Sequence, residues 1–133
     1  MQPLILIVED DSAVSSGYAE LLQSHGFRVM EVSTAAAARV AASEHVPALA
    51  LVDVVLPDGD GLDLATELRE RPGAGQMPVI AYTDQWSAEH ARRAQNSGVF
   101  ATLMKPAAPA HLLSEIYRAL AGLEAVRQIP SQE

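Results

Sequence analysis

The chain contains no cysteine, so disulfide bonds, thiolate catalysis and zinc–thiolate sites are all excluded. No apolar run approaches the roughly 18 residues that a membrane-spanning helix requires. The first residues, Met1-Gln2-Pro3-Leu4, include no basic region ahead of the apolar ones, so a secretory signal peptide is not expected. We therefore expect a cytoplasmic protein that does not enter a membrane.

Basic residues are scarce: 9 lysines and arginines stand against 17 aspartates and glutamates, and the formal net charge is −8. This balance disfavours direct nucleic-acid binding, which depends on neutralising phosphates. Hydrophobic residues make up 49% of the chain and the mean hydropathy is +0.10, which argues against disorder. A chain of 133 residues suits one domain with a single core. We expect that domain over residues 1–123, followed by a tail or the start of a linker over residues 124–133.

Short apolar runs alternate with amphipathic segments five times along the chain. The runs indicate strands, the most continuous of them buried on both faces, and the segments between them have the spacing and capping residues of helices. Strict alternation predicts an α/β fold, a doubly wound five-stranded parallel sheet with five helices. We expect strands at residues 4–8, 28–32, 48–52, 78–82 and 99–104, and helices that begin near residues 12, 35, 61, 86 and 109.

Polar residues stand where the first, third, fourth and fifth strands end. All strands of a parallel sheet end at the same edge, where the ligands of such sheets bind, so these residues are expected to share one site. The alternative is a scatter of helix caps and surface charges. The strand-end residues are Glu9 and Asp10, Asp53, Thr83 and Lys105.

The segment after Asp53 predicts a tight loop and then a helix, because Pro57 and Gly61 supply turn geometry. Two further acids lie in this loop, Asp58 and Asp60. We interpret them as a turn residue and a helix cap rather than as metal ligands.

Three clustered carboxylates repel one another, so the strand-end acids imply a bound cation. Oxygen ligands without histidine or cysteine favour Mg²⁺ or another divalent cation. Lys105 adds a compact positive charge that suits a phosphoryl oxygen, and Thr83 adds a hydroxyl donor. The set fits phosphoryl transfer onto the carboxylate of Asp53, catalysed mainly by positioning and electrostatics.

These motifs resemble the receiver domain of two-component response regulators, over roughly residues 4–121. The resemblance rests on the acids after the first strand, on Asp53 and its Leu56-Pro57 loop, on Thr83 and on Lys105-Pro106. It implies a flavodoxin-like strand order 2-1-3-4-5. It also implies that Asp53 receives phosphate from a histidine kinase or phosphotransfer protein, that Thr83 and Lys105 contact the phosphoryl group, and that magnesium is held by Glu9, Asp10, Asp53 and the backbone carbonyl of Val55.

The resemblance further implies a signalling domain rather than an enzyme, with at most self-phosphorylation and self-dephosphorylation. Such a domain would switch the binding of an output domain or downstream protein through its fourth helix, fifth strand and fifth helix, as a monomer or weak homodimer. The helix expected at residues 86–96 has few large apolar residues, so it should be among the less stable elements.

Three positions depart from the family pattern. Asp84 follows the threonine where a small residue is common, which bears on the chemistry. Thr102 stands three positions before the lysine where an aromatic is usual, and Ala107 replaces a bulky apolar residue; both bear on the signalling face. We assign Asp84, Trp86 and Thr102 to the switch and partner face.

Other functions remain to be weighed. A receiver-like interaction module that works without phosphorylation is motivated by Asp84 and Thr102. A phosphohydrolase of the haloacid dehalogenase type is disfavoured, because Val55 stands where that class usually has a second acid and no segment is long enough for a substrate cap. A flavin-binding flavodoxin is disfavoured because the first strand ends in acids.

Overall fold

The computed structural model describes residues 2–71 and 73–128. Its centre is a five-stranded parallel sheet with the order β2-β1-β3-β6-β7. Counted within this sheet, the order is 2-1-3-4-5, so the predicted fold class is confirmed. The strands are β1 (Leu4–Val8), β2 (Arg28–Val32), β3 (Leu49–Asp53), β6 (Val79–Thr83) and β7 (Ala101–Met104).

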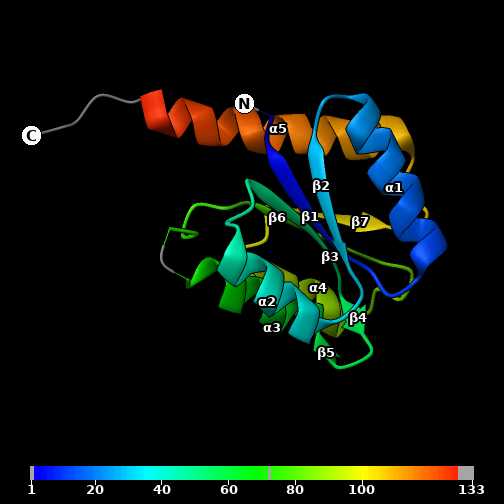
Figure 1. The fold of residues 1–133 in the computed structure, drawn as a ribbon. Coiled ribbons are helices and arrows are strands. Elements are labelled where there is room, and N and C mark those ends of the chain that lie inside the picture. Colours follow the sequence, from blue (N-terminus) through cyan, green and yellow to red (C-terminus); the bar gives the residue numbers. More distant parts are fainter. Residues whose placement is uncertain (1, 72, 129–133) are drawn as a thin grey trace, which may run out of the picture.

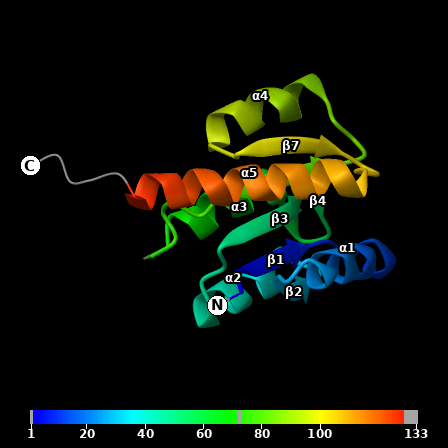
Figure 2. The same ribbon diagram turned by 90° about the horizontal axis from the view of Figure 1, so that it is seen from above.

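Helices cover both faces of the sheet within the described residues. One face carries the first and last helices, and the other carries the three between them (Figure 1). Seen from above, β7 and the fourth helix lie at the edge opposite β2 (Figure 2). The helices are α1 (Ser12–Ser24), α2 (Ala35–Glu44), α3 (Gly61–Arg69), α4 (Ala88–Ser97) and α5 (Pro109–Gln128).

The central strands are those with unbroken apolar sequences. Every residue of β3 and β6 is buried, and so are the last four residues of β1. Strands covered by helices on both faces need such runs, because neither side of the pleat meets water. The edge strand β7 buries only Leu103. The core therefore fixes β1, β3 and β6 most firmly, and their carboxyl ends deliver the predicted site residues other than Lys105, which follows β7.

Gly61 lets α3 begin directly against the phosphoacceptor candidate. A Cβ atom at this position would lie 2.8 Å from the carbonyl carbon of Asp53 and 2.9 Å from the Cα atom of Val54. The Gly61 N–H donates to the carbonyl of Val54 at 2.8 Å. Between Asp53 and α3 the chain forms a small antiparallel pair that the sequence analysis treated only as a loop, β4 (Val55–Leu56) and β5 (Gly59–Asp60).

Two helix boundaries differ from those expected. Helix α4 begins at Ala88 rather than near residue 86, because the side chain of Ser87 caps it by accepting the His90 N–H at 3.0 Å. Helix α5 continues to Gln128, past residue 123 where the sequence analysis ended the domain. The remainder of the predicted tail, residues 129–133, lies outside the described residues, and the domain boundary stays a prediction. In the described part of the chain, no helix is both long and apolar enough to span a membrane.

Candidate functional site

The carboxyl ends of β1 and β3 bring together Glu9, Asp10 and Asp53. One carboxylate oxygen of each lies within 4.8 Å of those of the other two. Glu9 and Asp53 are only 1% and 4% exposed, whereas Asp10 is exposed. Buried carboxylates are costly unless something positive meets them. The donor set consists of hard oxygen atoms, which fits Mg²⁺ or a similar divalent cation.

Lys105 supplies part of that positive charge. Its Nζ lies 2.6 Å from Oδ2 of Asp53 and 2.6 Å from Oε1 of Glu9. The position of the lysine is set by the neighbouring strands, because the Lys105 N–H donates to the carbonyl of Thr83 at 3.0 Å, just after β7 ends. The peptide bond between Lys105 and Pro106 is cis. Three strand ends therefore meet in one buried group of opposite charges.

The pKa directions follow from burial and from these contacts. Burial raises the pKa of Asp53 above its ordinary value, and hydrogen bonds from Lys105 and the Val55 N–H offset this only in part. Burial also raises the pKa of Glu9, but hydrogen bonds from Lys105, the Asp11 N–H and Tyr82 outweigh it, so that pKa is lowered. For Lys105, burial lowers the pKa, but hydrogen bonds to Asp53 and Glu9 outweigh it and the pKa is raised. The lysine and Glu9 thus hold their charges in a partly desolvated setting, where electrostatic interactions are stronger than in water.

Thr83 ends β6 and is fully buried. Its Oγ1 accepts the N–H of Gln85 at 3.2 Å, so the hydroxyl is tied to the loop that leads into α4. Asp84, the next residue, is exposed and is not a member of the acid cluster found among the described residues. The structure thus brings together the side chains of Glu9, Asp10, Asp53 and Lys105, with Thr83 at the end of the neighbouring strand and Asp84 outside the acid cluster.

Asp60 caps α3, as interpreted from the sequence, whereas Asp58, interpreted there as a turn residue, also caps a helix. Asp58 accepts the N–H groups of Ala35 and Ala36 at 2.7 and 3.0 Å, so it caps α2 across the chain. Asp60 caps α3 through Leu62 and Asp63. These contacts occupy both carboxylates away from the acid cluster.

The sequence analysis missed Tyr82. Its hydroxyl donates to Oε1 of Glu9 at 2.8 Å, and the side chain is fully buried. A signal was present, because a tyrosine in the middle of a buried strand needs a partner for its hydroxyl. What the sequence could not show is that this partner is a site acid.

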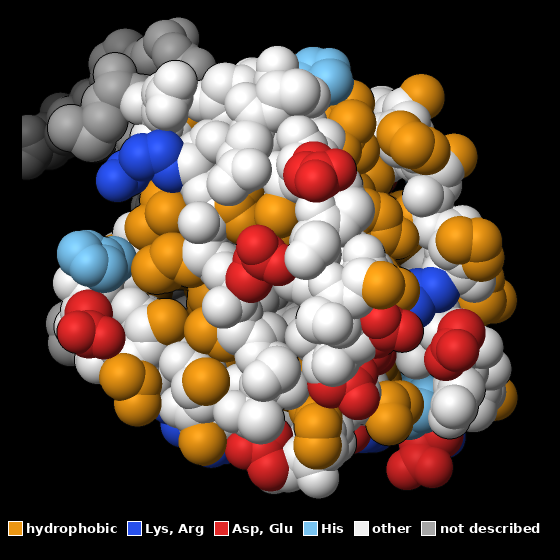
Figure 3. Space-filling view, turned by 45° about the vertical axis from the view of Figure 1, so that its right-hand side comes forward, with side chains coloured by type: hydrophobic (Ala, Val, Ile, Leu, Met, Phe, Trp, Pro, Cys, Tyr) orange, Lys and Arg blue, Asp and Glu red, His pale blue; other side chains and the backbone are white. Residues whose placement is uncertain are grey.

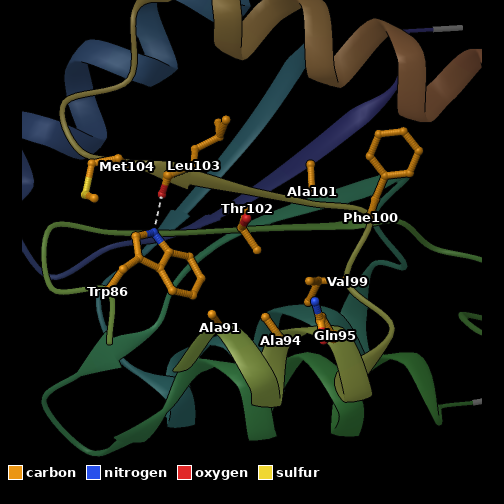
Figure 4. A pocket seen from close by; sticks show the side chains of 10 residues that line it. All are labelled: Trp86, Ala91, Ala94, Gln95, Val99, Phe100, Ala101, Thr102, Leu103 and Met104. Atoms are coloured by element: carbon orange, nitrogen blue, oxygen red, sulfur yellow. Dashed lines mark hydrogen bonds between the residues drawn. The ribbon is translucent and has the colours of Figure 1, made fainter. Parts of the chain in front are cut away.

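The predicted switch residues Trp86 and Thr102 line a groove of about 490 Å³ between α4 and β7 (Figure 4). The indole N–H of Trp86 donates to the carbonyl of Leu103 at 2.9 Å. Small side chains, Ala91 and Ala94 from α4 and Ala101 from β7, leave the groove open along its length. Trp86 is thus a packing residue at the entry to α4, next to the position where Thr102 stands in place of an aromatic.

The family model for the response regulator receiver domain matches residues 5–117 of this chain. The chain belongs to that family. The match covers the strands and helices that carry every site residue, so the predicted resemblance is confirmed.

The relatives of this receiver domain include two named regulatory proteins. The transcriptional regulatory protein GltR of Pseudomonas aeruginosa is 36% identical over 114 residues, which are 84% of this chain and 46% of that protein. The photosynthetic apparatus regulatory protein RegA of Rhodovulum sulfidophilum is 37% identical over 106 residues, which are 79% of this chain and 56% of that protein. The receiver domain spans about half the length of these relatives.

Solved structures agree with the fold. A CheY-like receiver domain from Methanospirillum hungatei superimposes with a TM-score of 0.89 and 30% identity, over 94% of this chain and 98% of that one. The receiver family is one of signalling domains. Neither the phosphohydrolase nor the flavodoxin alternative gains support from these comparisons.

Proposed function

We propose that this receiver domain accepts a phosphoryl group on Asp53 from a histidine kinase or phosphotransfer protein, in a reaction that requires Mg²⁺. The observation that carries the proposal is the contact of Lys105 with Asp53 beside the acid cluster. A buried carboxylate with a fixed ammonium group at one oxygen suits attack on phosphorus, since both reacting charges are held in place before reaction.

In the proposed step, a carboxylate oxygen of Asp53 forms a bond to phosphorus as the phosphorus–nitrogen bond of the donor phosphohistidine breaks. The imidazole nitrogen leaves with the electron pair of that bond, and the ring departs as neutral imidazole because its other nitrogen carries a proton. Lys105 then pairs with a phosphoryl oxygen in place of part of its contact with Asp53. Thr83 donates its hydroxyl to another phosphoryl oxygen.

The residues that would hold magnesium are Glu9, Asp10, Asp53 and the backbone carbonyl of Val55. When bound, the ion would offset negative charge on the transferring phosphoryl group. The chain supplies these groups from two strand ends and from the start of β4. The acid cluster fits that task, because its oxygen atoms already lie close enough to share one ion.

Intact-mass measurement of the wild-type protein tests the proposal. Incubation with phosphoramidate and MgCl₂ should add one phosphate, and the same mixture with the metal chelated should add none. A spectrum that stays unmodified in saturating magnesium and donor would contradict the proposal and favour an interaction module that works without phosphorylation.

The proposed binding partners of this domain are inferred from its membership of the receiver family. We propose a histidine kinase or phosphotransfer protein as the phosphate source, and an output domain or downstream protein as the receiver of the signal. On the face shown in Figure 3, acidic side chains are widely spread and basic ones are few. That surface supports the expectation that this chain does not itself bind nucleic acid.

Replacing Asp84 with alanine should speed phosphorylation about twofold at low salt, because a single exposed charge outside the acid cluster exerts only a weak repulsion on the incoming phosphoryl group. Added salt should reduce the difference, since exposed charges are screened. Initial rates with phosphoramidate measure the effect. Glu89→Ala, which removes an acid from the first turn of α4, serves as the control. Equal rates for Asp84→Ala and wild type at low salt would show that Asp84 does not act on the site.

A further inference from the structure

Tyr82 contacts the proposed phosphorylation site but is not among the site residues that the resemblance to the receiver family implies. It stands in β6 immediately before Thr83, yet its side chain lies on the other face of the strand, in the core with Ile5, Ile7 and Leu103. Its hydroxyl donates to Oε1 of Glu9 at 2.8 Å. The nearest ring is that of Tyr18, which packs edge-on with the ring centroids 5.7 Å apart.

The carboxylate of Glu9 is held at both oxygen atoms. Oε1 receives the Tyr82 hydroxyl and approaches Lys105 Nζ at 2.6 Å, and Oε2 accepts the N–H of Asp11 at 3.1 Å. Three donors from three segments fix the plane of this one side chain. Glu9 is therefore held in one orientation, with a carboxylate oxygen within 4.8 Å of those of Asp10 and Asp53.

Tyr82 also supports the lysine. Lys105 Nζ lies 4.7 Å from the centroid of the Tyr82 ring, within the range of a cation–π interaction. One neutral side chain thus contacts both the acid Glu9 and the cation Lys105. A neutral donor is the right type for this place, because a second cation beside Glu9 would repel an incoming metal ion.

We infer that Tyr82 is a positioning residue for the divalent cation: its hydroxyl orients Glu9 and its ring supports Lys105. The inference rests on the proposed function, because it concerns the same cation site. Groups that orient a metal ligand commonly change metal affinity by about 10- to 100-fold when they are removed. Since Glu9 keeps two other donors, the lower end of that range applies here.

The test is the variant Tyr82→Phe, which keeps the ring, its packing and its contact with Lys105 but removes the hydroxyl. The apparent dissociation constant for Mg²⁺ should rise about tenfold. At saturating magnesium, the phosphorylation rate should stay within about twofold of wild type, since the nucleophile and the lysine remain in place. Binding is measured by titrating MgCl₂ and following the amide resonances of the protein by NMR, without any phosphate donor.

Tyr18→Phe is the matched control, because it removes a hydroxyl from the neighbouring ring. That hydroxyl accepts the Ala107 N–H at 3.3 Å, and we place it outside the site. Its magnesium affinity should equal that of wild type. A second control is a double-mutant cycle with Glu9→Gln: once the carboxylate is gone, Tyr82→Phe should weaken magnesium binding little further.

The outcomes separate this inference from the function on which it rests. Wild-type protein that binds no magnesium would overturn both. Wild-type protein that binds magnesium, with Tyr82→Phe equal to it, would overturn the inference alone. A Tyr82→Phe protein that no longer unfolds cooperatively on heating would show that the hydroxyl serves the fold, and it would also overturn the inference.

Discussion

Asp53→Asn should carry no added phosphate under conditions that modify the wild-type protein completely. The amide oxygen and nitrogen are poor nucleophiles, and among the described carboxylates only Asp53 and Glu9 contact Lys105. Glu9 also contacts the lysine, but its two oxygen atoms are occupied by Tyr82, Lys105 and a backbone N–H. Intact-mass spectra after incubation with phosphoramidate and MgCl₂ measure the loss directly.

Asp58→Asn provides the matched control for this prediction. It makes the same chemical change five residues along the chain, at an acid that caps α2 and lies outside the cluster. It should be phosphorylated to the wild-type extent, although it loses part of a helix cap. If Asp53→Asn still gains a phosphate, a peptide map of the modified protein would identify the residue used instead, and Asp53 would not be the acceptor.

The fold could be predicted because its signals are local and repeated. The runs that form β1, β3 and β6 are almost wholly apolar, and every position in them except Leu4 is buried in the structure. Helix starts were also readable, and in the structure Asp11, Thr34 and Asp60 accept backbone N–H groups at the starts of α1, α2 and α3. The alternation of strands and helices predicts a parallel sheet whose strands all end at one edge. This is why the sequence alone could predict that the strand-end residues share one site.

The rest depended on contacts between segments far apart in the chain. The β4–β5 pair has strands of two residues each, too short for any periodic pattern. The partner of the Tyr82 hydroxyl is 73 positions away. Asp58 was read as a turn residue, but its capping of α2 joins positions 22 and 23 apart. Side-chain hydrogen bonds of this kind are decided by the packed structure, not by local propensity.

Helix α4 shows how such contacts change an interpretation made from sequence. The structure agrees that little apolar surface holds it, because Ala94 is its buried residue. Two arginines hold it instead. Arg93 pairs with Asp60 at 2.7 Å and with Asp63 at 3.1 Å, and Arg69 donates to the carbonyl groups of Ser97 and Gly98 at 3.3 and 3.0 Å. The helix is thus fastened to α3 at polar points, while its side toward β7 borders the groove (Figure 4).

This arrangement favours a switch that runs through the loop before α4. Thr83 Oγ1 accepts the Gln85 N–H at 3.2 Å. If the threonine hydroxyl turns toward a phosphoryl oxygen, the hydrogen bond from the Gln85 N–H to Thr83 Oγ1 is broken. The loop that carries Trp86 must then change its conformation. Thr102 cannot take the part of a swinging aromatic, because it lacks the bulk and its β-branched side chain is stiff.

Thr83→Ala should therefore abolish most of the response of Trp86 to a phosphate mimic. In the wild-type protein, magnesium with beryllofluoride should change the emission of Trp86, the only tryptophan in the chain. A hydrogen bond to a charged group contributes about 1.5 to 3 kcal/mol, so its loss shifts a two-state equilibrium by more than about tenfold. Phosphorylation itself should persist, since Asp53 and Lys105 are untouched, and intact-mass spectra check this in the same samples.

Thr102→Ala is the matched control, because it removes a hydroxyl from the groove beside Trp86 but not from the phosphate site. Its fluorescence response should equal that of wild type, whereas a switch driven from the β7 side would lose amplitude in this variant. A Thr83→Ala protein that responds like wild type would refute the coupling through Thr83. Wild-type protein that shows no change in emission, and none in amide exchange across residues 84–104, would move the signalling surface away from α4 and β7 altogether.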